Sequence, residues 1–471
     1  MDAPLTVTAA AAALRAGEVS SAELVEQAIA AADRLDARLG TFLDRYVDQA
    51  RAAAATADAL LASGDPVGPL TGVPLGVKDL ITTSEGPTTA MSLVHDPEWN
   101  GRRDAVAVAR LRRAGGIVMG KTTTAEFAIG EADEGSPFPE LRNPWHPGHH
   151  PGGSSSGTGS GVATGQFLAG LGTDTGGSIR IPAAFCGVTG LMPTYGRVPK
   201  SGCVPLAYSM DRIGPMARSA ADCALLLSVL AGHDDSDPTS AREPVDDHPA
   251  ALTGDLTGLR IGVDDMSAAP VPGDDPAVPG VLAAAVEVLR AAGAEVVDVR
   301  LPLWAELNLV NVMTMFIEAA TYHQPDFERQ WSRYGKLTRG RIAAGLYYSA
   351  TDFVQAQRVR RVGMRRVAEL FGQVDLVVTP TVTAGAPPLV QTGWTRLDDG
   401  GTTVRAGYWN TTGNPALSVP MGFTDAGLPL GLQVVGRPFE ESLVLRAGDA
   451  FQQRTDWHLR VPQLAAPAPA A

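Results

Sequence analysis

The sequence predicts a layered α/β fold, because segments with helical and strand-like patterns alternate along it. Residues 104–114 have the pattern of a helix that Gly115 ends, and the short apolar run 117–120 follows as a strand. The same order of helix, turn and strand recurs at residues 281–292 and 294–299. Such alternation is typical of helices layered on a sheet. With 471 residues, of which 45% are hydrophobic, the chain can form two domains or one large α/β unit.

The N-terminal residues 1–65 are predicted to form a helical layer. Ser20 and Glu23 have the spacing of a capping box, which opens a helix over residues 20–35. A second helix is expected near residues 47–61, where an alanine-rich run continues the helical pattern.

Further elements follow from short apolar runs and from longer runs with one apolar face. The expected strands are 72–81, 259–263, 376–379, 416–419 and 432–435, and the expected helices are 220–230, 352–371 and 442–451. The segment 232–247 is rich in Asp, Ser and Pro, which predicts an exposed loop. After Leu464 the chain contains only Ala and Pro, so residues 464–471 are predicted to be a disordered tail.

Charge and hydropathy exclude two classes of partner. The net charge is −13 and Lys and Arg form no dense block, so we expect no binding to nucleic acid. The alanine-rich runs 8–14 and 52–61 do not approach the roughly 18 apolar residues of a membrane span. The first residues show no basic stretch before an apolar one, which predicts no secretory signal and a cytoplasmic location.

The three cysteines, Cys186, Cys203 and Cys223, are odd in number and have no CxxC spacing. This pattern argues against a disulfide framework and against a structural zinc site. We therefore expect each cysteine to be a small buried hydrophobic residue.

Two glycine-rich stretches, residues 151–161 and 172–182, have the most unusual pattern in the chain. Glycine lets the main chain approach a ligand closely, and successive N–H groups in such turns can bind a developing oxyanion. Ser178, in the second stretch, is therefore a candidate nucleophile. A flexible linker is the alternative for 151–161, but a linker does not need a second Gly-Gly-Ser at 176–178. A phosphate-binding loop is set aside because no Gly-Lys-Ser or Gly-Lys-Thr follows.

A serine nucleophile needs a base, which is usually histidine. None of the eight histidines stands in a persuasive motif. His146, His149 and His150 cluster in a proline-rich loop, where we expect surface residues or at most a weak adventitious metal site.

Lysine is scarce in this chain, and Lys78 lies inside the apolar stretch 72–81. Burial lowers the pKa of a lysine toward a value at which the neutral amine accepts a proton. An ion pair with Asp79 or another carboxylate is the alternative, and it would keep Lys78 charged. Lys121 could take either role, because spacing alone does not distinguish the two lysines.

Several ordered motifs between residues 72 and 214 resemble the amidase signature family. They are Gly-Val-Pro-Leu-Gly-Val-Lys-Asp at 72–79, Asn-Pro-Trp at 143–145, Pro-Gly-Gly-Ser-Ser-Ser-Gly at 151–157, Gly-Thr-Asp-Thr-Gly-Gly-Ser-Ile-Arg-Ile-Pro at 172–182, Ala-Phe-Cys-Gly at 184–187, Pro-Thr-Tyr-Gly-Arg at 193–197 and Asp-Arg-Ile-Gly at 211–214. The resemblance implies a large mixed central β-sheet with helices on both faces. It also implies a single domain over residues 1–463, with a signature core at 70–215 and a variable substrate-shaping region at 300–410.

Carried onto matching positions, the resemblance implies a catalytic triad of Lys78, Ser154 and Ser178. Ser178 would be the acyl nucleophile, Ser154 the bridging serine after a cis peptide bond, and Lys78 the base. The oxyanion hole would consist of the backbone N–H groups of Thr175, Gly176, Gly177 and Ser178. No metal or organic cofactor is implied.

Residues around the triad have supporting roles in this scheme. Asp174 and Arg180 are expected to pair and to hold the glycine-rich loop in shape. Ser155 and Ser156 are expected to be structural loop residues that tolerate substitution.

The resemblance favours a free-standing amidase that hydrolyses a small amide, with related carbamate, hydrazide or ester bonds as variants. The alternatives are a glutamine-dependent amidotransferase subunit of the glutamyl-tRNA type, and a catalytically silent binding or scaffold protein. Thr403 stands where the transamidation subunits tend to have an acidic residue. Residues 136–141 and Met192 also depart from the family pattern. A homodimer is a further expectation.

The substrate is expected to be hydrophobic or aryl, because aromatic and methionine side chains are frequent in the second half of the chain. The candidate segments are 303–322, 331–348 and 394–409, with Trp304, Met313, Met315, Phe316, Tyr322, Trp331, Tyr334, Tyr347, Tyr348, Tyr408 and Trp409. At such spacings these side chains are more often core than pocket lining.

Overall fold

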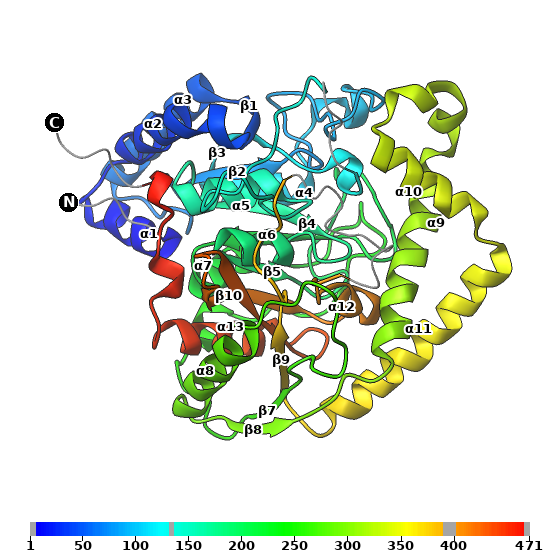
Figure 1. The fold of residues 1–471 in the computed structure, drawn as a ribbon. Coiled ribbons are helices and arrows are strands. Elements are labelled where there is room, and N and C mark those ends of the chain that lie inside the picture. The colour runs from blue at the N-terminus through cyan, green and yellow to red at the C-terminus, as the bar shows by residue number, and fades with distance from the viewer. Residues whose placement is uncertain (1–5, 131–135, 390–401, 466–471) are drawn as a thin grey trace.

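The computed structural model describes residues 6–130, 136–389 and 402–465, and the strands among them form one sheet of eleven (Figure 1). The strands are β1 (Phe42–Arg45), β2 (Pro74–Lys78), β3 (Ile117–Thr122), β4 (Ala169–Asp174), β5 (Thr189–Met192), β6 (Arg212–Ala217), β7 (Arg260–Val263), β8 (Glu295–Asp298), β9 (Leu376–Pro380), β10 (Ala416–Phe423) and β11 (Pro429–Val435). Their order across the sheet is β1-β3-β2-β4-β6-β5-β10-β11-β9-β7-β8. The runs β3-β2-β4 and β9-β7-β8 are parallel and the other pairs are antiparallel, which confirms the mixed sheet.

Helices surround this sheet. They are α1 (Val7–Ala16), α2 (Ser21–Leu39), α3 (Val47–Ser63), α4 (Val106–Arg113), α5 (Ser156–Thr164), α6 (Arg180–Cys186), α7 (Ala220–Leu230), α8 (Val278–Ala291), α9 (Trp304–Gln330), α10 (Lys336–Tyr347), α11 (Ala350–Phe371), α12 (Gly407–Thr412) and α13 (Glu441–Gln452). Helices α9 to α11 form a curved layer on one side of the molecule, and α1 to α3 lie on the opposite side (Figure 1). Each helix and strand expected from the sequence is present with its ends shifted by a few residues. The expected tail lies outside the described residues from position 466 onward.

Local sequence signals explain where the helices begin and end. The Ser20 hydroxyl accepts a bond from the Glu23 N–H at 3.1 Å, and the Glu23 carboxylate accepts one from the Ser20 N–H at 2.8 Å. This is the predicted capping box of α2. Gly40 ends the same helix with a φ of 63°, a conformation that glycine adopts without steric cost.

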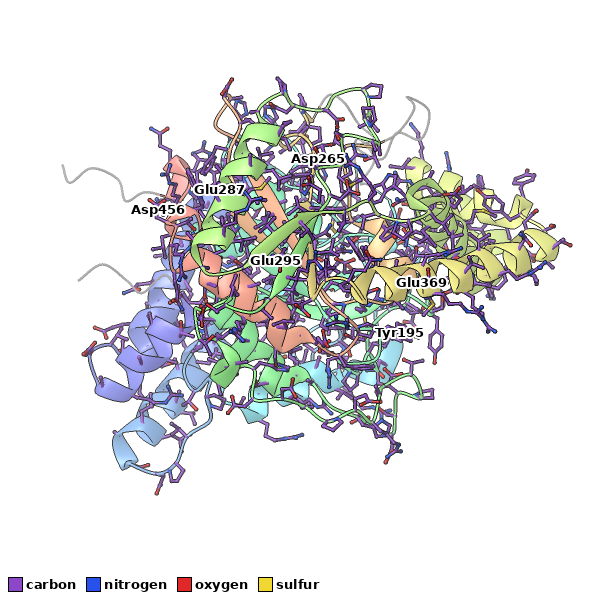
Figure 2. All side chains as sticks on the ribbon, turned by 90° about the horizontal axis from the view of Figure 1, so that it is seen from below. Tyr195, Asp265, Glu287, Glu295, Glu369 and Asp456 are labelled. Carbon is purple, nitrogen blue, oxygen red and sulfur yellow. The ribbon has the colours of Figure 1, made fainter. Side chains whose placement is uncertain are left out.

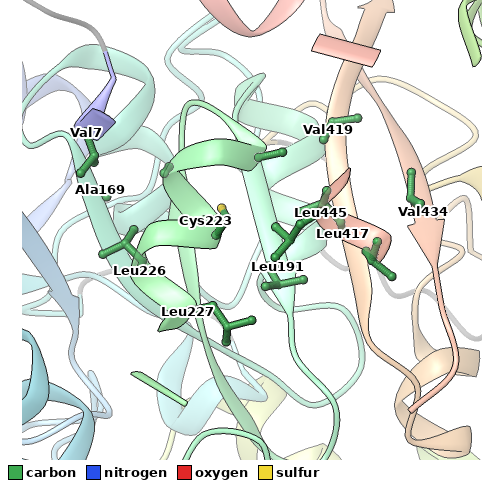
Figure 3. Packing of buried hydrophobic residues seen from close by; sticks show 14 of the residues in the cluster. Val7, Ala169, Leu191, Cys223, Leu226, Leu227, Leu417, Val419, Val434 and Leu445 are labelled. Atoms are coloured by element: carbon green, nitrogen blue, oxygen red, sulfur yellow. The ribbon is translucent and has the colours of Figure 1, made fainter. Parts of the chain in front are cut away.

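One face of the sheet packs against α7, α8 and α13. Leu417 and Val419 of β10 belong to the same buried cluster as Leu227 of α7 and Leu445 of α13, and Figure 3 shows them converging from these elements. Side chains alternate along a strand, so Ala416 of β10 points to the other face, where it joins a different cluster.

The other face is covered in two parts. At the β2 end, Met119 packs with Val162 of α5 in one cluster. At the β9 end, Val377 packs with Leu307 of α9 and Val367 of α11 in another. Helices therefore cover both faces, as the resemblance implies.

The glycine-rich stretch 151–161 is largely helical, because α5 begins at Ser156. A Cβ on Gly157 would lie 2.2 Å from the Thr41 carbonyl, and one on Gly161 would lie 2.1 Å from the Phe167 ring. The glycines thus allow α5 to pack closely against its neighbours, which is the physical reason why a flexible linker is the wrong interpretation.

Acidic side chains are spread over the outer elements instead of forming one cluster. Figure 2 shows five of these exposed groups: Asp265, Glu287, Glu295, Glu369 and Asp456. Within the described ranges, no helix combines the length and the hydropathy needed to cross a membrane.

Candidate active site

Lys78 lies at the end of β2, where its side chain is completely buried among hydroxyl groups. Its Nζ is 2.7 Å from Ser154 Oγ, 3.0 Å from Ser155 Oγ and 2.7 Å from Thr173 Oγ1. A charged ammonium donates to all three oxygens, whereas a neutral amine has two N–H groups and one lone pair. If all three contacts persist in the neutral state, one of the three hydroxyls must therefore donate a hydrogen bond to the lone pair of Lys78.

Ser155 is not free to be that donor. Its hydroxyl donates to the Thr173 carbonyl at 3.2 Å and accepts from the Thr173 N–H at 3.2 Å. Its remaining role toward Lys78 is to accept a bond, so the hydrogen bond to the lone pair of a neutral Lys78 comes from the hydroxyl of Ser154 or Thr173. Ser155 thus has the structural role that was expected and, in addition, a contact with Lys78 that was not expected. Thr173 is a contact that the sequence reasoning missed.

Burial controls the protonation of Lys78. Removal from water lowers the pKa of Lys78 from 10.5 to about 7, and Cys203, Asp174 and Asp211 oppose that shift in part. The amine can accordingly lose its proton near neutral pH.

Asp79 does not hold Lys78 charged, because it pairs with the other candidate lysine. Lys121 Nζ lies 3.0 Å from Asp79 Oδ1, and both side chains are 1% exposed. Lys121 also donates to Thr88 Oγ1 at 2.6 Å. The alternative of an ion pair at Lys78 is therefore wrong, and Lys121 takes that structural role.

The residue that follows Ser154 bonds to Ser178 through the backbone. The Gly153–Ser154 peptide bond is cis. The Ser155 N–H donates to the Ser178 carbonyl at 3.1 Å, which fixes the two glycine-rich stretches side by side. Ser178 is 8% exposed, whereas Lys78 is 0% and Ser154 is 1% exposed. Ser178 is thus the most exposed of the three predicted triad residues.

Asp174 shapes the loop that leads to Ser178, here called the oxyanion loop (residues 174–178). Its carboxylate accepts bonds from the Gly177 N–H at 2.7 Å and the Ile179 N–H at 3.1 Å, and forms an ion pair with Arg180 at 3.0 Å. Burial would raise the pKa of Asp174, but the charge and hydrogen bonds of Arg180 outweigh burial and lower the pKa. The Asp174 and Arg180 pair is present as expected.

Four backbone N–H groups were expected to form the oxyanion hole, and one of them is already bonded. The Gly177 N–H already donates to Asp174. In the part of the chain that the structure describes, no acceptor takes the N–H groups of Thr175, Gly176 and Ser178. Three of the four expected donors therefore remain available.

Arg180 connects the oxyanion loop to the last quarter of the chain. Its guanidinium donates to Asn410 Oδ1 at 2.6 Å on α12 and to Gln433 Oε1 at 2.7 Å on β11. Asn410 Nδ2 donates in turn to Asp174 Oδ1 at 2.8 Å. The sequence reasoning missed Gln433, although a glutamine inside an apolar strand is a signal of a buried polar contact.

A cavity of about 230 Å³ adjoins Thr173 and Thr175. Its apolar lining consists of Leu80, Trp99, Ala128, Cys203, Val204, Pro205, Leu206, Ile213 and Pro238, and Lys200, Arg212 and Asp237 contribute charged side chains. Asp211 also lines it, but its carboxylate accepts from Thr175 Oγ1 at 2.6 Å and from the Leu206 N–H at 2.8 Å. The free space beside the site is thus mainly apolar.

Most of the aromatic candidates for substrate contact are packed elsewhere. Tyr334 and Phe316 belong to a buried cluster with Phe127, Trp304 stacks on Tyr408, and Tyr347 is exposed. Part of the candidate segment 394–409 lies outside the described residues.

The cysteines and histidines form no metal site. Cys186 and Cys223 are buried as expected, whereas Cys203 is half-buried and lines the cavity. His146 and His149 lie close, with 2.8 Å between their Nδ1 atoms. Among the described residues no group of three or more His, Cys, Asp or Glu side chains is placed to hold a metal ion.

Comparison with known proteins identifies the family. The family model named Amidase matches residues 23–445. The chain belongs to the Amidase family. It is 41% identical to the A subunit of the glutamyl-tRNA(Gln) amidotransferase of Chloroflexus aggregans, over 98% of both chains. Like other members of the Amidase family, it is an enzyme of carbon–nitrogen bond chemistry, a hydrolase or an amidotransferase.

Solved structures of Amidase family members share the fold. The peptide amidase of Stenotrophomonas maltophilia is 31% identical, with a TM-score of 0.82 over 96% of this chain and 98% of that chain. The A subunit of the glutamyl-tRNA(Gln) amidotransferase of Thermotoga maritima is 29% identical, with a TM-score of 0.77 over 92% of each chain. The large mixed sheet with surrounding helices is thus the amidase signature fold.

Proposed function

We propose that this enzyme cleaves an amide-type bond through an acyl-enzyme on Ser178. The observation that carries the proposal is the position of Lys78 Nζ, 2.7 Å from Ser154 Oγ in a fully buried site. Burial makes the neutral amine accessible near neutral pH, so Lys78 can accept a proton by way of Ser154. The Ser178 hydroxyl, on the most exposed residue of the predicted triad, is the proposed source of that proton.

The proposed reaction has two steps, acylation of Ser178 and hydrolysis of the acyl-enzyme. In the first step Ser178 Oγ bonds to the substrate carbonyl carbon, its proton passes to Ser154, and the Ser154 proton passes to Lys78. The carbon–nitrogen bond then breaks, and the leaving amine takes a proton back along the same path. In the second step water replaces Ser178 on the acyl carbon, with Lys78 and Ser154 again carrying the proton.

The oxyanion loop supplies the electrostatic part of the proposal. The N–H groups of Thr175, Gly176 and Ser178 have no acceptor among the described residues, and they lie in the turn that carries the nucleophile. Donors fixed before the reaction are each worth about 3 kcal/mol toward a developing oxyanion. The bond from the Gly177 N–H to Asp174 keeps the turn in shape for the other three.

The cavity lining supports a small hydrophobic or aryl substrate group. Of the polar side chains that line it, Asp211 is already bonded to Thr175, and Lys200 donates to Tyr195 Oη at 3.1 Å. The other two charged side chains of the lining are also bonded, since Arg212 donates to the Met210 carbonyl at 2.9 Å and Asp237 accepts from the Lys200 N–H at 2.8 Å. The apolar residues of the wall would therefore favour an uncharged group.

A second candidate is a glutamine-dependent amidotransferase subunit, in which Ser178 would release ammonia from glutamine for a partner-bound acceptor. The observation that favours it is the 41% identity to the A subunits of glutamyl-tRNA(Gln) amidotransferases over 98% of the chain. The apolar cavity and Thr403 favour the free-standing amidase instead. Thr403 is an uncharged residue whose carbonyl accepts from the Thr383 N–H at 2.8 Å.

One experiment separates the two candidates. Purified chain is incubated with a panel of aryl and aliphatic amides, anilides, carbamates and glutamine, and released amine or ammonia is measured beside Ser178→Ala. Turnover of apolar amides that Ser178→Ala abolishes supports the amidase. Turnover of glutamine alone, or turnover that needs added partner subunits, supports the amidotransferase. A folded protein that turns over none of these and resists a serine-directed fluorophosphonate contradicts both.

A further inference from the structure

Asn311 lies on α9, inside the candidate segment 303–322 but not among the residues named there, and it contacts the oxyanion loop. Its side chain is buried, and Nδ2 donates to the Thr175 carbonyl at 3.1 Å. The second N–H of the same amide points to Met210 Sδ at 3.4 Å. Because both N–H groups have acceptors, the orientation of the amide is fixed.

Two glycines make room for this amide. A Cβ on Gly176 would lie 3.0 Å from Asn311 Oδ1, and a Cβ on Gly407 would lie 2.8 Å from the same atom. Both distances are shorter than side-chain packing tolerates without movement. The Asn311 amide is therefore wedged between the oxyanion loop and the first residue of α12.

Peptide geometry links this contact to the oxyanion hole. Within the described residues only the Gly153–Ser154 bond is cis, so the bond between Thr175 and Gly176 is trans. In a trans peptide the carbonyl and the following N–H point in opposite directions. A Thr175 carbonyl held toward α9 therefore turns the Gly176 N–H away from α9, where no described acceptor takes it.

We propose that Asn311 is a positioning residue for the oxyanion hole, which aims the Gly176 N–H by holding the Thr175 carbonyl. The proposal rests on the acyl-enzyme function proposed above. The neighbouring groups have other anchors, since Gly177 donates to Asp174 and the Thr175 hydroxyl donates to Asp211. In the described part of the chain, no side chain other than Asn311 bonds the peptide between Thr175 and Gly176.

The test does not require the natural substrate. A fluorophosphonate phosphonylates Ser178 and releases fluoride, and its phosphoryl oxygen develops negative charge where the substrate oxygen would lie. Asn311→Leu keeps the branched shape and the number of heavy atoms but has no donor. Its second-order labelling rate is expected to fall about 10- to 100-fold, because a misdirected donor loses much of the roughly 100- to 1000-fold effect of a whole donor.

Asn308 provides the matched control. It lies one turn earlier on α9, and its Nδ2 donates to the Trp304 carbonyl of the same helix at 2.8 Å. Asn308→Leu is expected to label within about threefold of wild type, because it leaves the oxyanion loop unchanged. Asn311→Asp keeps the size of the side chain while placing a carboxylate oxygen against the Thr175 carbonyl, and is expected to label at least as slowly as Asn311→Leu.

The outcomes distinguish the inference from the function on which it rests. Wild type that fails to label at Ser178 overturns the proposed function itself. Wild type that labels while folded Asn311→Leu labels equally fast overturns the role of Asn311 alone. If Asn311→Leu does not fold, as judged by thermal denaturation, Asn311→Asp decides.

With any substrate that is turned over, kcat of the Asn311 variants is expected to fall while KM stays within about threefold of wild type. A rise in KM at constant kcat would make Asn311 a substrate-binding residue and overturn the inference.

Discussion

Lys121 Nζ lies 3.0 Å from Asp79 Oδ1 in a buried ion pair. Asp79 directly follows the catalytic candidate Lys78 in the chain. Asp79 follows the last residue of β2, and its carboxylate contacts Lys121 and the Thr89 hydroxyl, so it has different surroundings from Lys78 although the two are neighbours in the chain. The pair thus neutralises the carboxylate closest in sequence to Lys78 and leaves Lys78 among hydroxyl groups.

Lys121→Met should destabilise the protein strongly, because it leaves the Asp79 carboxylate buried without a counter-ion. The expected loss in the free energy of unfolding is about 3–5 kcal/mol. Urea unfolding of the variant beside wild type measures it. The double variant Lys121→Met/Asp79→Asn, which removes both charges, should recover a large part of the loss. A single variant as stable as wild type would show that the pair contributes nothing.

Activity should fall on acidification, because Lys78 must be neutral to accept a proton. With a pKa of about 7, kcat/KM is expected to drop about tenfold for each pH unit below that value. The ionisable groups that act on Lys78 are Cys203, Asp174 and Asp211. A pH profile with the best substrate of the panel tests the expectation, and a flat profile from about pH 8 to about pH 5 would exclude lysine as the base.

The same titration should appear in the stability of the protein. Unfolded Lys78 has its ordinary pKa of 10.5 and folded Lys78 has a pKa of about 7, so the unfolded state binds more protons between these values. The free energy of unfolding contributed by Lys78 therefore rises with pH over that window, by on the order of 3 kcal/mol. Lys78→Met lacks this contribution. Urea unfolding at about pH 7 and about pH 9.5 should show wild type gaining stability relative to the variant, and a constant difference would refute the lowered pKa.

Ser155 and Ser156 should differ sharply in their effect on catalysis. Ser155→Ala removes one acceptor of Lys78 and a link to Thr173, and is expected to lower kcat about five- to tenfold, the equivalent of one hydrogen bond. Ser156→Ala removes a bond to the Gly152 carbonyl at the start of α5, and should leave kcat nearly unchanged. Steady-state kinetics of both variants, with thermal denaturation as control, compares them. Equal losses would mean that both serines act only through the loop.

The elements with local signals could be predicted from the sequence. The capping box of α2, the glycine-ended α4 and the apolar strand β2 depend on neighbouring residues, and each is present. Helices α9 and α10 were not predicted as helices, and Pro325 inside α9 interrupts the pattern on which such a prediction depends.

The roles of the two lysines could not be assigned from the sequence, because sheet register decides them. Strands β2 and β3 pair in parallel with a shift in register between Leu75 and Gly76, which places Lys121 opposite Val77 and Thr122 opposite Lys78. A one-residue change of register turns every side chain to the other face. The choice between Lys78 and Lys121 thus depends on a pairing between two segments that are distant in the chain, which spacing within either segment does not reveal.

The contact of Arg180 with Gln433 has a consequence for the order in which the enzyme can become active. Gln433 follows Arg180 by 253 residues in the chain. At about 5–20 residues per second, a ribosome needs roughly 13–50 s to make that interval. For most of this time the nascent guanidinium has neither Asn410 nor Gln433 to bond, so water must solvate it. The oxyanion loop is therefore synthesised early, but the bonds of Arg180 to Asn410 and Gln433 that hold it form late. Reactivity at Ser178 should emerge only when the final strands have been synthesised.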